Sequence, residues 1–94
     1  MKKLVETAQA IFDLSRLQII KLLQTREMCV CELAELSNLS SPRISQHLAV
    51  LRRVVIVKER RDGKWIFYSL IPETIAEFNR SWDSLIAQSI TSLP

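Results

Sequence analysis

Apolar residues in the first quarter of the chain recur at intervals of three and four, the period of one face of an α-helix. This spacing predicts a first helix over Lys3 to Phe12. A second helix is expected directly after it, with Asp13 or Ser15 as its N-cap and an end near Thr25 or Arg26. The side chains expected to face the core from this second helix are Leu14, Leu17, Ile20 and Leu23.

A short third helix and a longer fourth helix are predicted in the middle of the chain. Residues 32 to 36 support the third helix, after an extended connection over residues 27 to 31. A tight turn is expected at Asn38, because asparagine tolerates the left-handed conformation that often ends a helix. The fourth helix then has Ser41 as its N-cap and Pro42 in its first turn, and its buried edge is Ile44, Leu48 and Leu51.

The pattern becomes β-rich from Val54 onward. Two runs of β-branched and aromatic residues flank Asp62-Gly63, a dipeptide that favours a tight hairpin turn. A last helix is predicted from Pro72, with apolar residues close to a 3-4 spacing. The order therefore predicts a mainly α fold with one small β-hairpin, a winged helix-turn-helix of the order ααααββα.

Composition limits the class of protein. The 94 residues, of which 48% are hydrophobic, are enough for one core, so residues 1–94 are expected to form a single domain. No apolar run approaches the roughly 20 residues of a membrane span, and the N-terminus does not resemble a signal peptide. We therefore expect a cytoplasmic protein with no membrane partner, in which Cys29 and Cys31 are free thiols.

Positive charge is concentrated in one window of the chain. The net charge is only +3, but residues 43 to 64 hold seven basic and two acidic residues. The rest of the chain holds six basic and eight acidic residues. Such a concentration is expected of a face that binds phosphates, and double-stranded DNA is the predicted partner.

The fourth helix and the hairpin tip supply the candidate DNA contacts. A reading helix presents polar side chains near its N-terminus while its other face packs on the core. Arg43 and Gln46 are the best candidates for base edges, and the hairpin tip suits backbone phosphates. The alternative is an ordinary solvated helix followed by a basic hairpin. The full candidate set is Ser40, Ser41, Arg43, Ser45, Gln46, His47, Arg60, Arg61 and Lys64.

Cys29 and Cys31 are the candidate ligands for a soft ion. They lie where the third helix begins, and a helix N-terminus favours the thiolate, so reactivity near neutral pH is expected. Side chains two apart in an α-helix do not face one another. One ion held by both sulfurs is therefore expected to unwind the first turn and weaken DNA binding. The alternative is two small buried residues with no ligand, or one buried and one exposed.

Three segments together resemble the ArsR/SmtB family of regulators: EMCVCEL at 27–33, SSPRISQHLAVLR at 40–52 and DGKWIFYSL at 62–70. The resemblance extends from about Phe12 to Pro72. It implies a winged-helix homodimer, joined through its first and last helices, that represses an operon by binding operator DNA. It also implies release by arsenite or antimonite bound to the cysteine thiolates, with no obligatory cofactor.

The chain departs from the family pattern at three places. The arsenite-type motif often has a third cysteine where this chain has Ala34. A small residue and a glycine commonly follow the reading helix, where this chain has Val54-Val55. The turn before the second helix usually reads Asp-Pro-Thr-Arg, and here it is Asp13-Leu-Ser-Arg16.

Other functions are weighed against this one. The last helix has no histidine for a zinc- or nickel-type site, and residues 1–28 contain no extra cysteine of the cadmium or lead type. Redox sensing, or cadmium or zinc sensing, by the same two thiols is the alternative within regulation. Enzyme activity is not expected, because no catalytic Ser-His-Asp set, phosphate loop or redox Cys-x-x-Cys is present.

The first and last helices are expected to join two copies of the chain. Their apolar residues would leave an exposed stripe on a monomer this small, and a symmetric partner would cover it. The alternative is that they close the core of the monomer. The residues expected at the dimer interface are Leu4, Ala8, Ile11, Phe78, Trp82, Leu85 and Ile90.

Overall fold

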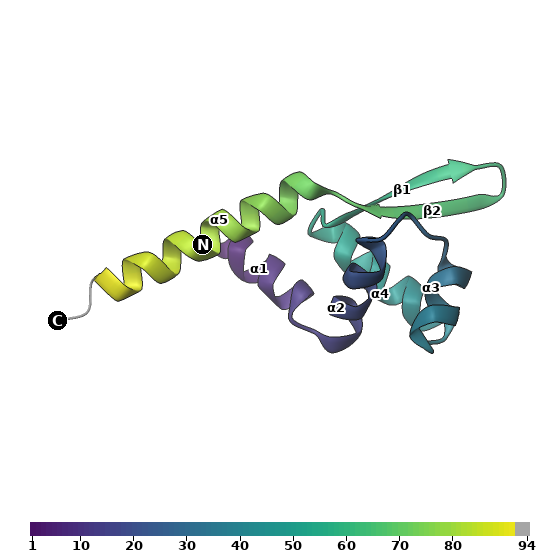
Figure 1. Ribbon diagram of the computed structural model, residues 1–94, viewed down its shortest axis with the longest axis horizontal. Helices are drawn as coiled ribbons and strands as arrows, with labels where there is room; N and C mark the ends of the chain where they lie inside the picture. The colour runs from purple at the N-terminus through teal and green to yellow at the C-terminus, as the bar shows by residue number, and fades with distance from the viewer. Residues whose placement is uncertain (92–94) are drawn as a thin grey trace.

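The computed structural model describes residues 1–91, which form five helices and one antiparallel hairpin (Figure 1). The elements in order are α1 (Lys2–Ile11), α2 (Leu14–Leu23), α3 (Val30–Ser37), α4 (Ser41–Arg53), β1 (Val57–Asp62), β2 (Trp65–Leu70) and α5 (Pro72–Thr91). This order confirms the predicted winged helix-turn-helix. Within residues 1–91, no helix combines the length and the apolar character that a membrane crossing requires.

The molecule is elongated because α5 projects from one end. The helix α1 packs against α5, whereas α2, α3, α4 and the hairpin gather at the opposite end (Figure 1). The Cα radius of gyration is 15.2 Å, against about 12 Å for a compact domain of this length. Much of α5 therefore lies beyond the reach of the core.

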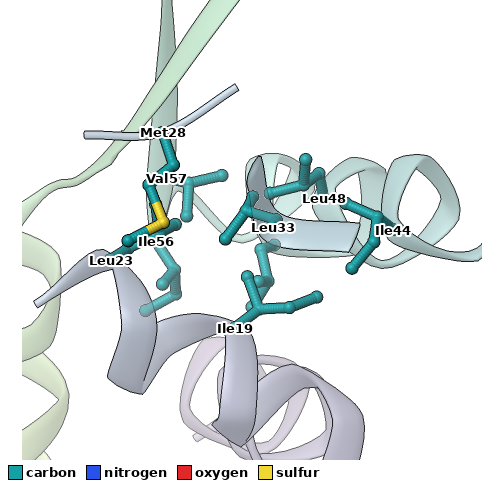
Figure 2. Close-up of a cluster of buried hydrophobic side chains, with 9 residues drawn as sticks. Ile19, Leu23, Met28, Leu33, Ile44, Leu48, Ile56 and Val57 are labelled. Carbon is teal, nitrogen blue, oxygen red and sulfur yellow. The ribbon is translucent and has the colours of Figure 1, made fainter. Parts of the chain in front are cut away.

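The core joins α2, α3 and α4 to the start of the hairpin (Figure 2). Leu33 of α3 is fully buried between α2 and α4, and the predicted edge of α4 is confirmed. The side chains of this cluster are Ile19, Leu23, Met28, Leu33, Ile44, Leu48, Leu51, Ile56 and Val57.

The predicted buried face of α2 is partly wrong. Leu14 is 84% exposed and Leu17 is 44% exposed, whereas Ile19, which the pattern did not single out, is fully buried. The helix turns Ile19 and Leu23 inward, and these two residues lie one turn apart on the same face. Only Leu23 and the partly buried Ile20 of the predicted set pack on the core.

The caps fix where α2, α3 and α4 begin and end. Asp13, one of the two candidates, caps α2 by accepting from the Arg16 backbone N–H at 3.0 Å. Ser40 caps α4, so the prediction of Ser41 was wrong by one residue, and Ser41 is the first helical residue. Asn38 ends α3 with a φ of 61°, as predicted.

The hairpin runs in one register from Val57↔Leu70 to Asp62↔Trp65. Its two-residue turn is Gly63-Lys64, and Gly63 has a φ of 62° that a glycine adopts without a Cβ clash. A third segment joins the outer edge of β2, because Met28 and Tyr68 exchange two backbone hydrogen bonds of 3.0 and 2.8 Å.

Val55 occupies a left-handed conformation between α4 and β1, with a φ of 62°. A β-branched side chain is strained there, at a cost of about 1–3 kcal/mol. This is the position at which the resembled family commonly has a glycine. The side chain is 52% exposed, so little burial offsets the strain.

We expect Val55→Gly to stabilise the protein by up to about 1 kcal/mol, because relief of the strain outweighs the backbone entropy that glycine adds. Urea unfolding at one fixed protein concentration measures the change. Val54→Gly is the control, because Val54 has a φ of −95° and is expected only to lose stability. Equal losses in both variants would contradict the assignment of strain to Val55.

Candidate DNA-binding surface and thiol pair

The exposed face of α4 carries most of the predicted DNA contacts. Ser40, Ser41, Arg43, Ser45 and Gln46 are all exposed, opposite the face that is buried in the core. The Ser40 hydroxyl accepts from the Arg43 backbone N–H at 3.4 Å and caps the helix. The N-terminus of α4 thus presents hydroxyls, backbone N–H groups and one cation to solvent, a combination suited to phosphates and base edges.

His47 is placed differently from its predicted neighbours. It is half-buried, and its Nδ1 lies 3.2 Å from Nη1 of Arg16 on α2. His47 is therefore less open to a DNA contact than the other predicted residues of α4. Its ring lies at the edge of the exposed face of α4 and is held from the side by Arg16.

The hairpin supplies cations, but not all of them are free. Arg61 and Lys64 near its turn are exposed. Arg60 instead pairs with Glu27 at 2.5 Å, lies 3.9 Å from Asp62 and stacks over the ring of Phe67 at 4.9 Å. The Arg60 guanidinium lowers the pKa of the Glu27 carboxyl. Arg60 therefore fastens the hairpin to the segment before α3.

The two cysteines meet at the start of α3. Cys29 is buried at 7% exposure and Cys31 is exposed, and their sulfurs are 2.8 Å apart. This contact differs from the expectation that the sulfurs converge only after the helix unwinds. Cys29 is the N-cap, with φ −85° and ψ 170°, so its extended backbone turns the side chain over the first turn toward Cys31.

Glu32 completes a capping box around Cys29. Its Oε1 accepts from the Cys29 backbone N–H at 3.1 Å, and its Oε2 accepts from Arg26 at 2.6 Å. These hydrogen bonds, first that from Cys29 and then that from Arg26, lower the pKa of the Glu32 carboxyl. The carboxylate therefore holds the N-cap residue in place.

The chemistry of Cys29 differs from the prediction of a low thiol pKa. Burial raises the pKa of Cys29, and the hydrogen bond with the Cys31 thiol raises it further. The backbone N–H of Glu32 acts in the opposite direction but is the weaker influence. Cys29 is thus a protonated thiol at neutral pH.

The cysteine pair supplies two protein ligands, the sulfurs of Cys29 and Cys31. Within the part of the chain that the structure describes, no group of three or more His, Cys, Asp or Glu side chains is arranged to hold a metal ion. Two adjacent sulfurs still suit a soft ion or metalloid that takes its remaining ligands from solution.

Sequence reasoning missed the link between the thiol pair and the hairpin. Met28, next to Cys29, bridges to Tyr68 of β2, and Glu27 pairs with Arg60 of β1. On its other side, Cys29 begins the helix whose Leu33 packs with α4. A bridge made by one residue leaves no periodic pattern in the sequence. Only the predicted extended conformation of residues 27 to 31 indicated that this bridge could form.

The predicted dimer residues lie on α1 and α5, and one of them, Ile11, also packs against the core. Phe78 and Trp82 stack at 6.4 Å, and Phe12, which was not predicted, lies edge-on to both at 6.2 and 6.1 Å. Phe12 is 59% exposed and Trp82 is 39% exposed. Leu4, Ala8, Ile11 and Leu85 are half-buried, and the Ile90 side chain lies outside the described residues.

Comparison with known proteins identifies the family. Residues 13–59 match the family model described as "Bacterial regulatory protein, arsR family". The chain is 36% identical over 85 residues to the uncharacterized HTH-type transcriptional regulator MJ1325 of Methanocaldococcus jannaschii, which covers 89% of this chain and 96% of that protein. It is 39% identical over 69 residues to the arsenical resistance operon repressor of Escherichia coli. The matched region covers 72% of this chain but only 59% of that repressor.

Solved structures agree on the fold. Reduced HlyU from Vibrio cholerae superposes with a TM-score of 0.73 at 37% identity, covering 83% of each chain. The homodimeric winged helix-turn-helix DNA-binding domain of Mb0332 from Mycobacterium bovis gives 0.76 at 22% identity, covering 96% of this chain and 82% of that one, a likeness of fold alone. The chain therefore belongs to the arsR family of bacterial regulatory proteins, as a winged helix-turn-helix transcriptional repressor and not an enzyme.

Proposed function

We propose that this chain is a metalloid-responsive repressor that binds operator DNA as a homodimer and is released when arsenite or antimonite binds Cys29 and Cys31. One observation carries the proposal: two sulfurs lie 2.8 Å apart at the first turn of the helix that packs on α4. The E. coli relative is named for arsenical resistance, which supports the choice of metalloid. The protein would act in the cytoplasm, where its operator DNA would lie.

The binding step needs only the two thiols. Trivalent arsenic as arsenous acid exchanges two hydroxyl groups for two sulfurs, and each thiol proton leaves with a hydroxyl as water. The third arsenic ligand remains a hydroxyl or is replaced by a thiol from solution, because Ala34 occupies the place of a third cysteine. No net proton is released, so a protonated Cys29 is compatible with binding at neutral pH.

Bound metalloid would disturb the reading helix by fixing the two sulfurs on one atom. In the free protein the two thiols contact each other at the start of α3. Bonding both sulfurs to one arsenic atom replaces that contact and sets a new distance and direction for each cysteine side chain. Cys29 is buried and hydrogen-bonded through its backbone to Glu32, so this movement strains the cap of α3 or shifts Met28.

The movement of Cys29 would reach both of the proposed DNA-binding elements, α4 and the hairpin. Through α3, the movement reaches Leu33 and the core against which α4 packs. Through Met28, it reaches the hairpin at Tyr68. A local change at the thiols is thus coupled to both α4 and the wing, as a two-state regulator requires.

DNA binding is proposed for the surface formed by α4 and the hairpin turn. Arg43 and Gln46 would contact base edges, and Ser40, Ser41 and Ser45 would contact phosphates. Arg61 and Lys64 supply phosphate contacts beside it. Arg60 and His47 make contacts within the protein, and their main role would be to hold this surface in shape.

The homodimer is proposed to form through α1 and α5. Four large apolar side chains there are exposed, at 48% for Val5, 59% for Phe12, 39% for Trp82 and 41% for Ile86. The projecting part of α5 has no core of its own to pack on (Figure 1). A second copy would cover this stripe, and Mb0332, which shares the fold, is described as homodimeric.

A redox switch is the second candidate, because contacting sulfurs are also suited to a disulfide. A peroxide would oxidise one thiol to a sulfenic acid and release water. The second thiol would then displace hydroxide from that sulfur, forming the disulfide and a second water. Arsenite binding and oxidation differ in mass, so intact-protein mass spectrometry separates them.

We expect Cys29 in a Cys31→Ser variant to react with iodoacetamide several-fold more slowly at neutral pH than Cys31 in a Cys29→Ser variant. Burial limits access and keeps the Cys29 thiol protonated. Its rate should keep rising with pH beyond the range of an ordinary thiol, since the thiolate is the nucleophile. A rate that is already at its plateau near neutral pH would contradict the raised pKa.

We expect arsenite to release the protein from a DNA duplex that is first selected from a random library. Release should be lost in Cys29→Ser and in Cys31→Ser, while Ala34→Ser, three residues after Cys31 on α3, keeps it. Fluorescence anisotropy at fixed salt measures release. Arsenite affinity should change little between pH 6.5 and 7.5, whereas cadmium affinity should rise by about a hundredfold per pH unit, because each thiol must lose a proton.

Release by cadmium but not arsenite would replace the metalloid with a soft divalent ion. Release by peroxide alone, with a loss of two hydrogens in mass, would favour the redox switch. Full release by arsenite in the two cysteine variants would overturn the thiol assignment.

We expect Trp82→Glu to convert the protein from a dimer to a monomer at micromolar concentration. A buried, unpaired carboxylate in a symmetric interface occurs twice, so its cost is doubled. Sedimentation velocity measures the mass. Leu14→Glu, at an exposed residue on α2, is the control and should remain dimeric; a monomeric wild type would remove the dimer.

A further inference from the structure

Arg16 joins three helices through one guanidinium group. It lies in the first turn of α2, and its side chain is only 17% exposed. Its Nε donates to the carbonyl of Ala10, its Nη2 donates to the carbonyl of Gln9 at 3.2 Å, and its Nη1 donates to His47 Nδ1 at 3.2 Å. The first two acceptors belong to α1 and the third belongs to α4.

The acceptors on α1 explain why an arginine stands here. The last carbonyls of a helix have no partner within the helix, and they carry its negative end. In α1, the Ala8 carbonyl accepts from Phe12 and the Ile11 carbonyl accepts from Asp13. The carbonyls between them are those that Arg16 takes, so the planar fork of the guanidinium satisfies the end of α1 and still reaches α4.

The contact with His47 fixes the state of that ring. A guanidinium only donates, so Nδ1 of His47 must present its lone pair to Arg16. The ring proton of the neutral imidazole then lies on Nε2. His47 is thereby held in one orientation at the edge of the DNA-facing side of α4.

We propose that Arg16 is a positioning residue for operator binding, which sets the reading helix α4 relative to the dimer-forming unit of α1 and α5 by bridging the Gln9 and Ala10 carbonyls to His47. The inference rests on the proposed dimeric DNA binding. Each DNA half-site meets one α4, and the two half-sites are about one helical turn apart. The angle between α4 and the α1–α5 unit therefore decides which spacing fits.

The first test uses DNA spacing. The probe is a palindromic duplex selected by the wild type from a random library, then remade with one base pair inserted between its halves. The insertion rotates one half-site by about a tenth of a turn, and we expect the wild type to lose about tenfold in affinity. Arg16→Lys keeps the charge but has one nitrogen for three acceptors. We expect the inserted base pair to lower the affinity of this variant by less than about threefold.

Three control variants separate positioning from other effects. Arg43→Ala should weaken binding to both duplexes alike. It should therefore keep the spacing penalty, which is the loss of affinity caused by the inserted base pair. His47→Asn, whose amide oxygen can accept from Arg16, should keep the penalty, whereas His47→Ala should reduce it. An unchanged penalty in Arg16→Lys would overturn the proposal.

The second test needs neither DNA nor a dimer. Spin labels at Ala49 of α4 and Asn79 of α5, both exposed, are placed in a Cys29→Ser, Cys31→Ser background and diluted with unlabelled protein. We expect Arg16→Lys to broaden the intramolecular distance distribution under conditions where circular dichroism shows the variant fully folded. A distribution as narrow as that of the wild type would overturn the proposal even if the protein bound no DNA.

Discussion

The burial of Leu33 between α2 and α4 is the contact on which the other features depend. It places α3 directly against the reading helix, with Ile44 and Leu48 in the same cluster (Figure 2). Because the cluster is closely packed, α3 cannot move at its N-terminus without consequences for α4. The thiol pair stands at that N-terminus, so the core itself joins the proposed soft-ligand site to the proposed DNA-binding surface.

Cys29 has a structural role and a proposed ligand role, and the two favour different protonation states of its thiol. As the N-cap of α3 and the neighbour of a β-bridge residue, it must be buried and held by Glu32. Burial raises the pKa of its thiol, which disfavours ligands that need a thiolate at neutral pH. A metalloid hydroxide that carries the thiol protons away as water avoids this conflict, which a divalent cation does not.

The hydrophobic pattern predicted those parts of the fold in which one face of an element is buried. Ile44, Leu48 and Leu51 were found because a regular spacing and a capped helix agreed. The hairpin was found because Asp62-Gly63 favours a tight turn, although the turn itself lies one residue later, at Gly63-Lys64. The pattern failed on α2, where apolar residues lie on several sides of the helix. Leu14 and Leu17 were as apolar as Ile19, and only tertiary packing decided between them.

The sequence was enough to name candidate site residues but not the contacts that they make. Cys29, Cys31 and Arg43 were recognisable from their types and neighbours, since helix ends and exposed cations have local signals. The contacts of Arg16 with His47, of Arg60 with Glu27 and of Met28 with Tyr68 join residues far apart in the chain, and no local period encodes them.

Internal contacts also decide how much of the basic window can face DNA. Among the described residues, Arg52 pairs with Glu59 at 3.4 Å and Arg60 pairs with Glu27, so two of the seven cations in this window are used to hold the hairpin. The others include Arg43 on α4 and Lys64 at the turn, both of which are exposed. The number of basic residues in this window therefore exceeds the number that is free of these ion pairs. The fixed pairs instead give that wing a defined position beside α4, on which the proposed reading of base edges depends.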